Sequence, residues 1–178
     1  MRKYVDDYEI AYEEDEKGRE KKVAVYKGDY FEVNLDQPSL IKYKRNNLIL
    51  LAVILLSHIA GGFVANQGMY YFFVALPYVA AFLPLYFLTA GVLRLSKEKK
   101  QYRRDEADLS FERIKKASTF LLILLIMTVL GEAIFLIFFT DQRDTLEFLY
   151  LSLESLALFA VYLMIRARNS ITIQEIKS

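Results

Sequence analysis

Four apolar runs separated by short polar stretches dominate this chain of 178 residues. They cover residues 48–64, 69–93, 117–139 and 146–165. Each run has about the 20 residues that an α-helix needs to cross the hydrocarbon core of a bilayer. A soluble domain rarely gathers 54% hydrophobic residues into blocks of this kind. The sequence therefore predicts a membrane protein with four transmembrane helices.

The basic residues predict how these helices are oriented. Of the 23 Lys and Arg residues, only Arg143 lies outside the leading tail, the loop Arg94–Lys116 and the closing tail. Basic residues near helix ends are retained on the cytoplasmic side, so we predict a multi-pass cell-membrane protein with both termini in the cytoplasm. The loop has nine basic and five acidic residues, which fits this retention and also fits contact with anionic lipid headgroups. Its acidic residues argue against nucleic acid as a partner.

The leading tail shows the pattern of a small β-rich module. Tyr8–Tyr12, Lys22–Tyr26 and Tyr30–Val33 are rich in β-formers and are separated by turn residues, which predicts a three-stranded meander. The closing tail has one further alternating stretch, Ser170–Gln174. We expect it either to pair with the meander as a fourth strand or to remain a frayed tail.

The predicted fold class is an all-α membrane protein, a four-transmembrane-helix bundle with a small N-terminal cytoplasmic β-meander. Three parts are expected along the chain. The first is a β-rich module at residues 1–46. The second is a transmembrane domain at 47–166, which has spans at about 48–66, 69–94, 116–139 and 145–166 and a cytoplasmic helical hairpin at 94–116. The third is a cytoplasmic tail at 167–178.

Small residues and prolines mark two of the predicted spans. Ser57, Gly61 and Ala65 recur every four residues, a spacing that lets another helix approach closely. Pro77 and Pro84 lie inside the second span. Proline removes a helical hydrogen bond and bends the helix, so this span is a candidate for a hinge or a hollow, although membrane helices often carry proline.

Three ionisable side chains, His58, Glu132 and Glu154, lie deep inside the apolar runs. Counted from the outer boundary at about 1.5 Å per residue, all three fall at a similar depth near the middle of the bilayer. Tyr78 on the second span lies at about the same depth. Because an unpaired charge there costs at least about 2.5 kcal/mol, we expect these four groups to face one another as a candidate binding layer.

Three interpretations of this layer remain open. Protonated carboxyls hydrogen-bonded to their neighbours would fix the register of the helices. A histidine with two carboxylates would also suit a proton relay or a cation site in a transporter. A metal site has the least support, because no Glu-x-x-His or His-x-x-x-His spacing is present.

Few enzymatic activities fit the sequence, and no cofactor is expected. There is no cysteine, which excludes thiolate catalysis and iron–sulfur clusters. His58 is the only histidine, which excludes a bis-histidine haem within one chain. No nucleophile elbow, phosphate loop or metalloprotease motif is present. The aromatic run Tyr70–Phe73 leaves a quinone or lipid pocket open, but it also fits interface anchoring.

Two functions of different classes follow from these observations. The first is a non-enzymatic accessory subunit in the bilayer, whose cytoplasmic parts bind another protein or a second copy of the chain. The second is a small proton- or cation-coupled transporter or channel that uses the layer of His58, Glu132 and Glu154. Uptake by the protein in liposomes would distinguish them.

Overall fold

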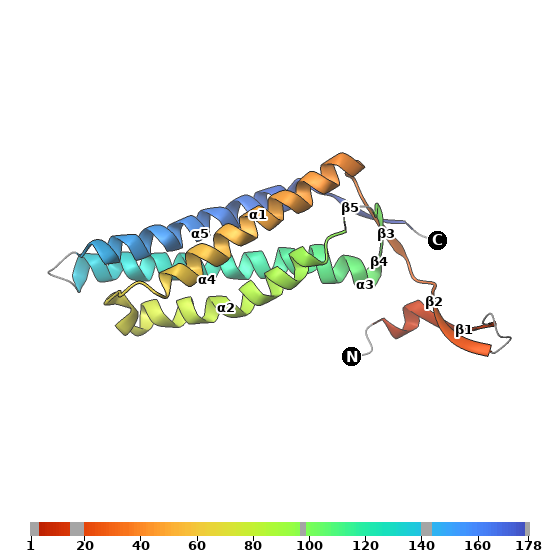
Figure 1. The fold of residues 1–178 in the computed structure, drawn as a ribbon, viewed down its shortest axis with the longest axis horizontal. Coiled ribbons are helices and arrows are strands. Elements are labelled where there is room, and N and C mark those ends of the chain that lie inside the picture. Colours follow the sequence, from red (N-terminus) through yellow and green to blue (C-terminus); the bar gives the residue numbers. More distant parts are fainter. Residues whose placement is uncertain (1–3, 15–19, 97–98, 140–143, 177–178) are drawn as a thin grey trace.

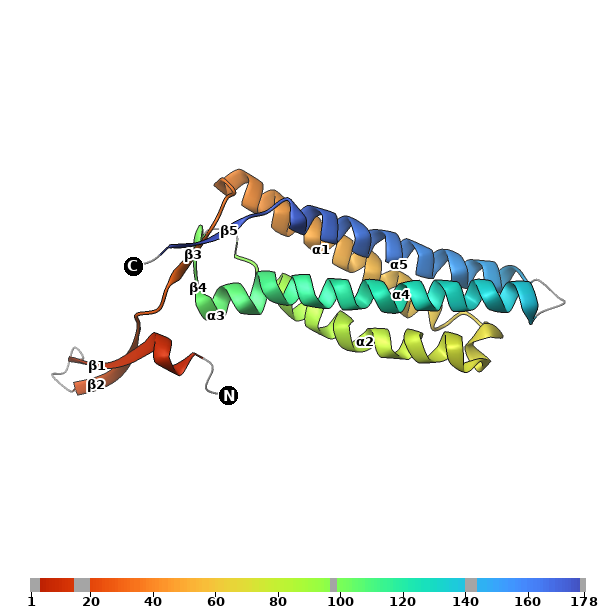
Figure 2. The same cartoon turned by 180° about the vertical axis from the view of Figure 1, so that it is seen from behind.

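Four long helices run side by side through most of the computed structural model (Figures 1 and 2). They are α1 (Gln37–Gly61), α2 (Phe72–Leu93), α4 (Arg113–Phe138) and α5 (Thr145–Asn169). Helix α2 packs on α4, α1 packs on α5, and α4 packs on α5.

The structure describes residues 4–14, 20–96, 99–139 and 144–176, so Arg143 lies outside it. The end of the bundle that carries the strands is named the strand end, and the other is the far end.

Three of the helices are long and apolar enough to cross a membrane, which is consistent with a membrane protein. They are α2, α5 and the continuous helix Arg104–Phe138 that contains α4. Helix α1 does not reach the same hydropathy, because its first turns carry basic side chains and it ends at Gly61. Its apolar part from Leu48 onward is roughly 21 Å long, whereas the hydrocarbon core of a bilayer is about 30 Å thick.

Helix α1 begins ten residues before the predicted domain boundary, at Gln37 instead of residue 47. Asp36 precedes the helix in an extended conformation, and Pro38 lies in the first turn. Proline is favourable there because the first N–H groups of a helix have no partner inside it. The residues around Lys44 therefore extend the helix beyond the apolar run and do not belong to the β-rich module.

The strands form two sheets, which corrects the predicted single meander. The first sheet is the hairpin of β1 and β2, and the second has the order β4-β3-β5 with antiparallel neighbours. The strands are β1 (Tyr8–Glu14), β2 (Glu20–Tyr26), β3 (Tyr30–Val33), β4 (Gln101–Arg103) and β5 (Ile173–Ile176). The prediction that the closing tail pairs with the module is confirmed for β3, although β5 begins later than Ser170.

The segment 94–116 is only partly the helical hairpin that the sequence predicts. Its second half is helical: α3 (Arg104–Ala107) and a π-helical turn, η3 (Asp108–Glu112), lead without a break into α4. Its first half contains β4, where Tyr102 is buried and its ring meets that of Phe111 edge-on at 5.2 Å. This aromatic contact and the ladder with β3 outweigh the helical propensity of the surrounding polar residues.

Candidate functional site

The buried polar centre of the bundle is an imidazole–carboxylate pair between α1 and α5. Nδ1 of His58 lies 3.0 Å from Oε2 and 3.2 Å from Oε1 of Glu154. Both side chains are completely buried. The two helices approach closely at Gly61, where a Cβ would lie 2.7 Å from Oε1 of Glu154. Gly61, one of the small residues predicted to let another helix approach closely, therefore makes room for the Glu154 carboxyl group.

Two aromatic rings of α2 surround the His58 imidazole. Tyr78 lies with its ring centroid 4.3 Å from that of His58, and Phe82 lies at 4.7 Å. The Tyr78 hydroxyl donates to the backbone carbonyl of His58 at 2.9 Å. Nε2 of His58 is buried and has no hydrogen-bond partner among the described residues. The imidazole is thus held by one carboxylate on one side and by aromatic surfaces on the other.

Glu132 on α4 lies in a second polar group nearer the far end. Its carboxyl faces the Glu147 carboxyl and the Asn66 amide. A Cβ on Gly68 would collide with this carboxyl, so the backbone of the α1–α2 connection covers Glu132 directly. Glu132 is completely buried, and neither of its carboxyl oxygens has a hydrogen-bond partner in the described part of the chain.

Glu147 is a member of this group that the sequence analysis missed. Its Oε1 accepts a hydrogen bond from the backbone N–H of Gln67 at 2.9 Å, and the residue is almost completely buried. The side-chain oxygen Oδ1 of Asn66 accepts a hydrogen bond from the backbone N–H of Met69 at 2.9 Å, which fixes the turn over the two acids. Oε2 of Glu147 has no partner among the residues that the structure describes. We name Asn66, Glu132 and Glu147 the acidic cluster.

Tyr150 lies between the histidine pair and the acidic cluster. It is completely buried, its ring centroid lies 6.0 Å from that of Tyr78, and its hydroxyl is 3.4 Å from Sδ of Met69. Glu147, Tyr150 and Glu154 are three and four residues apart on α5 and therefore share one face of the helix. This spacing was the signal in the sequence that could have identified Glu147 and Tyr150 as interior groups.

The structure brings together three of the four predicted layer residues and places the fourth elsewhere. His58 and Glu154 are hydrogen-bonded and Tyr78 packs on His58, but Glu132 has Glu147 as its acidic neighbour. The depth count assumed that each apolar run reaches the boundary as a helix. The α1–α2 connection instead folds over the far end, where Gly68 lies directly against the Glu132 carboxyl, so Glu132 lies beneath this connection and apart from the histidine pair.

The two groups have different chemical capacities. The histidine pair can exchange a proton between an imidazole and a carboxylate, and the mutual attraction of a charged pair in this geometry offsets part of the cost of burying the two charges. The acidic cluster can share a proton between two carboxyls, since two adjacent carboxylates repel when both are ionised. Across the described residues, no three His, Cys, Asp or Glu side chains gather closely enough to hold a metal ion.

Comparison of the chain with known protein families, curated proteins and solved structures finds no match. The class of the protein therefore follows from its own residues. It is a mostly helical chain with three helices suited to a bilayer, small sheets at one end of the bundle and buried polar groups between the helices.

Proposed function

We propose that this chain is a four-span protein of the cell membrane that acts as a non-enzymatic interaction subunit, with both termini in the cytoplasm. The basic residues of the two tails and of the loop Arg94–Lys116 support this orientation. Large apolar side chains on the outside of the helices support contact with lipid, including Leu56 of α1, which is 71% exposed. Helix α1 packs along α5 and would cross the bilayer with it despite its shorter apolar part.

The β1–β2 hairpin carries the interaction proposal. It projects from the strand end of the bundle (Figures 1 and 2). Ile10 is 69% exposed and Tyr12 is 61% exposed. The register places both on the same face of the hairpin, because Ile10 is paired with Ala24 and Tyr12 with Lys22. An isolated two-stranded hairpin is marginally stable in water, so a partner that covers this apolar face would stabilise it.

Contacts at the base of the hairpin hold it in a defined place on the bundle. The backbone N–H of Arg104 donates to the Tyr26 hydroxyl at 3.0 Å, and the Arg104 guanidinium lies 3.8 Å from the carboxylate of Asp7. The guanidinium of Arg103 lies 5.5 Å from the centre of the Tyr26 ring. A rigidly mounted apolar face binds a partner with less loss of conformational entropy than a free tail does.

Purification in mild detergent tests this function. We expect the wild-type protein to copurify with a stoichiometric protein partner or a second copy of itself, and Ile10→Asp/Tyr12→Asp to lose that partner. Val25→Asp is the matched control, because Val25 is paired with Glu9 on the opposite face of the same hairpin. Equal recovery of the partner with both variants would exclude the Ile10 face as the binding surface.

A transporter remains the second candidate, because several buried polar atoms have no partner. Within the described ranges these include Nε2 of His58 and both carboxyl oxygens of Glu132. Such groups are expensive to bury and often mark ion or proton pathways. Proton-coupled uptake or conductance in liposomes that is lost in Glu132→Gln, while helix content and stability are retained, would support transport over the interaction function.

A further inference from the structure

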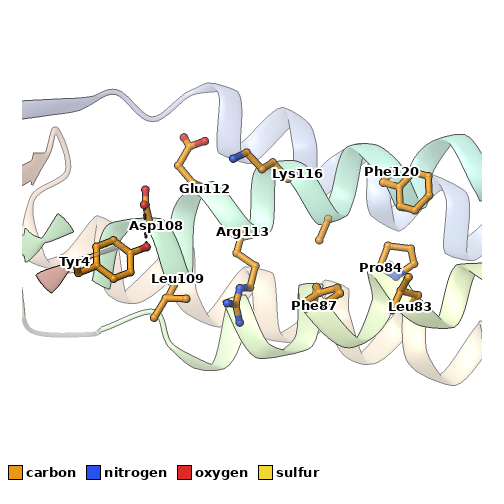
Figure 3. A pocket seen from close by; sticks show the side chains of 11 residues that line it. Tyr4, Leu83, Pro84, Phe87, Asp108, Leu109, Glu112, Arg113, Lys116 and Phe120 are labelled. Atoms are coloured by element: carbon orange, nitrogen blue, oxygen red, sulfur yellow. Dashed lines mark hydrogen bonds between the residues drawn. The ribbon is translucent and has the colours of Figure 1, made fainter. Parts of the chain in front are cut away.

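A groove lies on the outside of the bundle between α2 and α4, close to the strand end (Figure 3). Its volume is about 620 Å³, within the range of roughly 300–1,000 Å³ that is usual for small-ligand sites. Its apolar wall consists of Leu83, Pro84, Phe87, Ala117 and Phe120. Its polar end contains Tyr4, Asp108, Glu112, Arg113 and Lys116.

Two cations at the polar end have no carboxylate partner among the residues that the structure describes. Arg113 and Lys116 are three residues apart, so they lie one turn apart on the same side of α4. Neither takes part in an ion pair within the described portion of the chain. The Arg113 guanidinium lies 5.8 Å from the centre of the Phe87 ring, which places its charge at the edge of the apolar wall.

The two acids at the same end each have a partner of their own: Asp108 has Tyr4 of the groove lining, and Glu112 has Arg168, which does not line the groove. The Tyr4 hydroxyl donates to Oδ2 of Asp108 at 3.0 Å, a contact drawn in Figure 3. Oε1 of Glu112 lies 3.4 Å from Nη2 of Arg168 on α5. These contacts offset part of the negative charge of the acids and leave Arg113 and Lys116 as the cations available to an anionic ligand.

We propose that this groove binds one anionic phospholipid, with its phosphate between Arg113 and Lys116 and an acyl chain along the apolar wall. The proposal requires the chain to lie in a membrane but does not depend on the interaction subunit. The apolar part of α4 begins at Ala117, immediately after Lys116, so the cations lie at the level of lipid headgroups when α4 spans the bilayer. Arginine binds phosphate through paired N–H groups, and a neighbouring lysine adds a second charge.

Native mass spectrometry of the detergent-purified full-length protein tests this site. The protein is incubated with phosphatidylglycerol or with phosphatidylcholine of the same acyl chains. We expect preferential retention of phosphatidylglycerol, and a loss of roughly tenfold or more in its binding by Arg113→Gln/Lys116→Gln. The matched control Lys115→Gln/Lys42→Gln also removes two positive charges, but neither lysine lines the groove. It should retain the wild-type preference.

A charge-conserving variant and a chain-free headgroup complete the test. Arg113→Lys/Lys116→Arg should keep the preference for phosphatidylglycerol, which separates a loss of binding from a loss of folding. Glycerophosphoglycerol, which has the headgroup without acyl chains, should fail to displace the lipid. Displacement by this headgroup at the concentration of the lipid would overturn the phospholipid assignment. So would equal retention of the two lipids by the wild type, or unchanged binding by the double Gln variant.

Discussion

Glu132 and Glu154 are both completely buried acids, but their neighbours differ in charge. Glu154 faces an imidazole at hydrogen-bond distance, whereas Glu132 faces a second carboxyl. Removing the partner of a buried ion leaves its charge uncompensated, while removing one of two adjacent acids relieves repulsion. The same substitution at the two positions should therefore change stability differently.

The histidine pair should behave as a coupled unit in a double-mutant cycle. We expect His58→Ala and Glu154→Ala each to reduce the free energy of unfolding by roughly 3–5 kcal/mol, because each leaves a buried polar partner. The double variant should lose less than the sum of the two by about 1 kcal/mol or more. Unfolding in mixed detergent measures all three. Additive losses would show that the two side chains do not interact in the folded protein.

Glu132→Gln should stabilise the bundle by roughly 1 kcal/mol at neutral pH. The amide cannot ionise, and its N–H groups can donate to the unpartnered Oε2 of Glu147. Unfolding in mixed detergent compares this variant with Glu132→Ala, which should be destabilised because it leaves a cavity. A clear loss of stability in Glu132→Gln would indicate that the ionised carboxylate has a cationic partner in the native protein.

At the level of secondary structure, β3 depends on both of its neighbours. It has four residues and is paired on one edge with β4 and on the other with β5. So short a strand is held by the ladders on its two sides more than by its own propensity. The β1–β2 hairpin is a separate sheet and shares no ladder with β3.

Ending the chain after Ser170 should affect the two sheets differently. Without β5, amide hydrogen exchange in Tyr30–Val33 should accelerate, because one edge of β3 becomes open to water. Exchange in β2 should stay unchanged, because β2 is paired only with β1. Mass spectrometry of peptides from the two strands measures both rates. Equal acceleration in both would show that the sheets form one cooperative unit.

The sequence predicted the long helices better than the pairing of the strands. The apolar runs identified all four helices because each is a long, uninterrupted signal. Strand β4 has only three residues, Gln101–Arg103, inside a stretch of helix formers, so no local pattern could mark it. The partner of β3 follows from long-range packing around Tyr102. Glu147 was missed for a different reason: it directly follows a polar loop in the sequence, although its spacing from Glu154 places it on the interior face of α5.

At the level of the whole molecule, the proposed orientation can be measured with single cysteines, since the chain has none of its own. A cysteine at Gln67 should react with a membrane-impermeant reagent in intact cells, because the far end is predicted to lie outside. A cysteine at Arg104, at the strand end, should react only after the cells are opened. The reverse labelling pattern would invert the proposed topology and move the phospholipid groove to the outer leaflet.

The position of β3 between β4 and β5 also imposes an order on biosynthesis. The two edge partners of β3 both follow it along the chain, and β5 is synthesised only after α5. At roughly 5–20 residues per second, about 7–28 s separate the synthesis of β3 from that of β5. During this interval β3 lacks its partner on one side, because β5 is synthesised only after α5. The sheet can therefore be completed only after all four long helices have been synthesised. A chain that stops earlier exposes an open edge of β3 to chaperones and proteases.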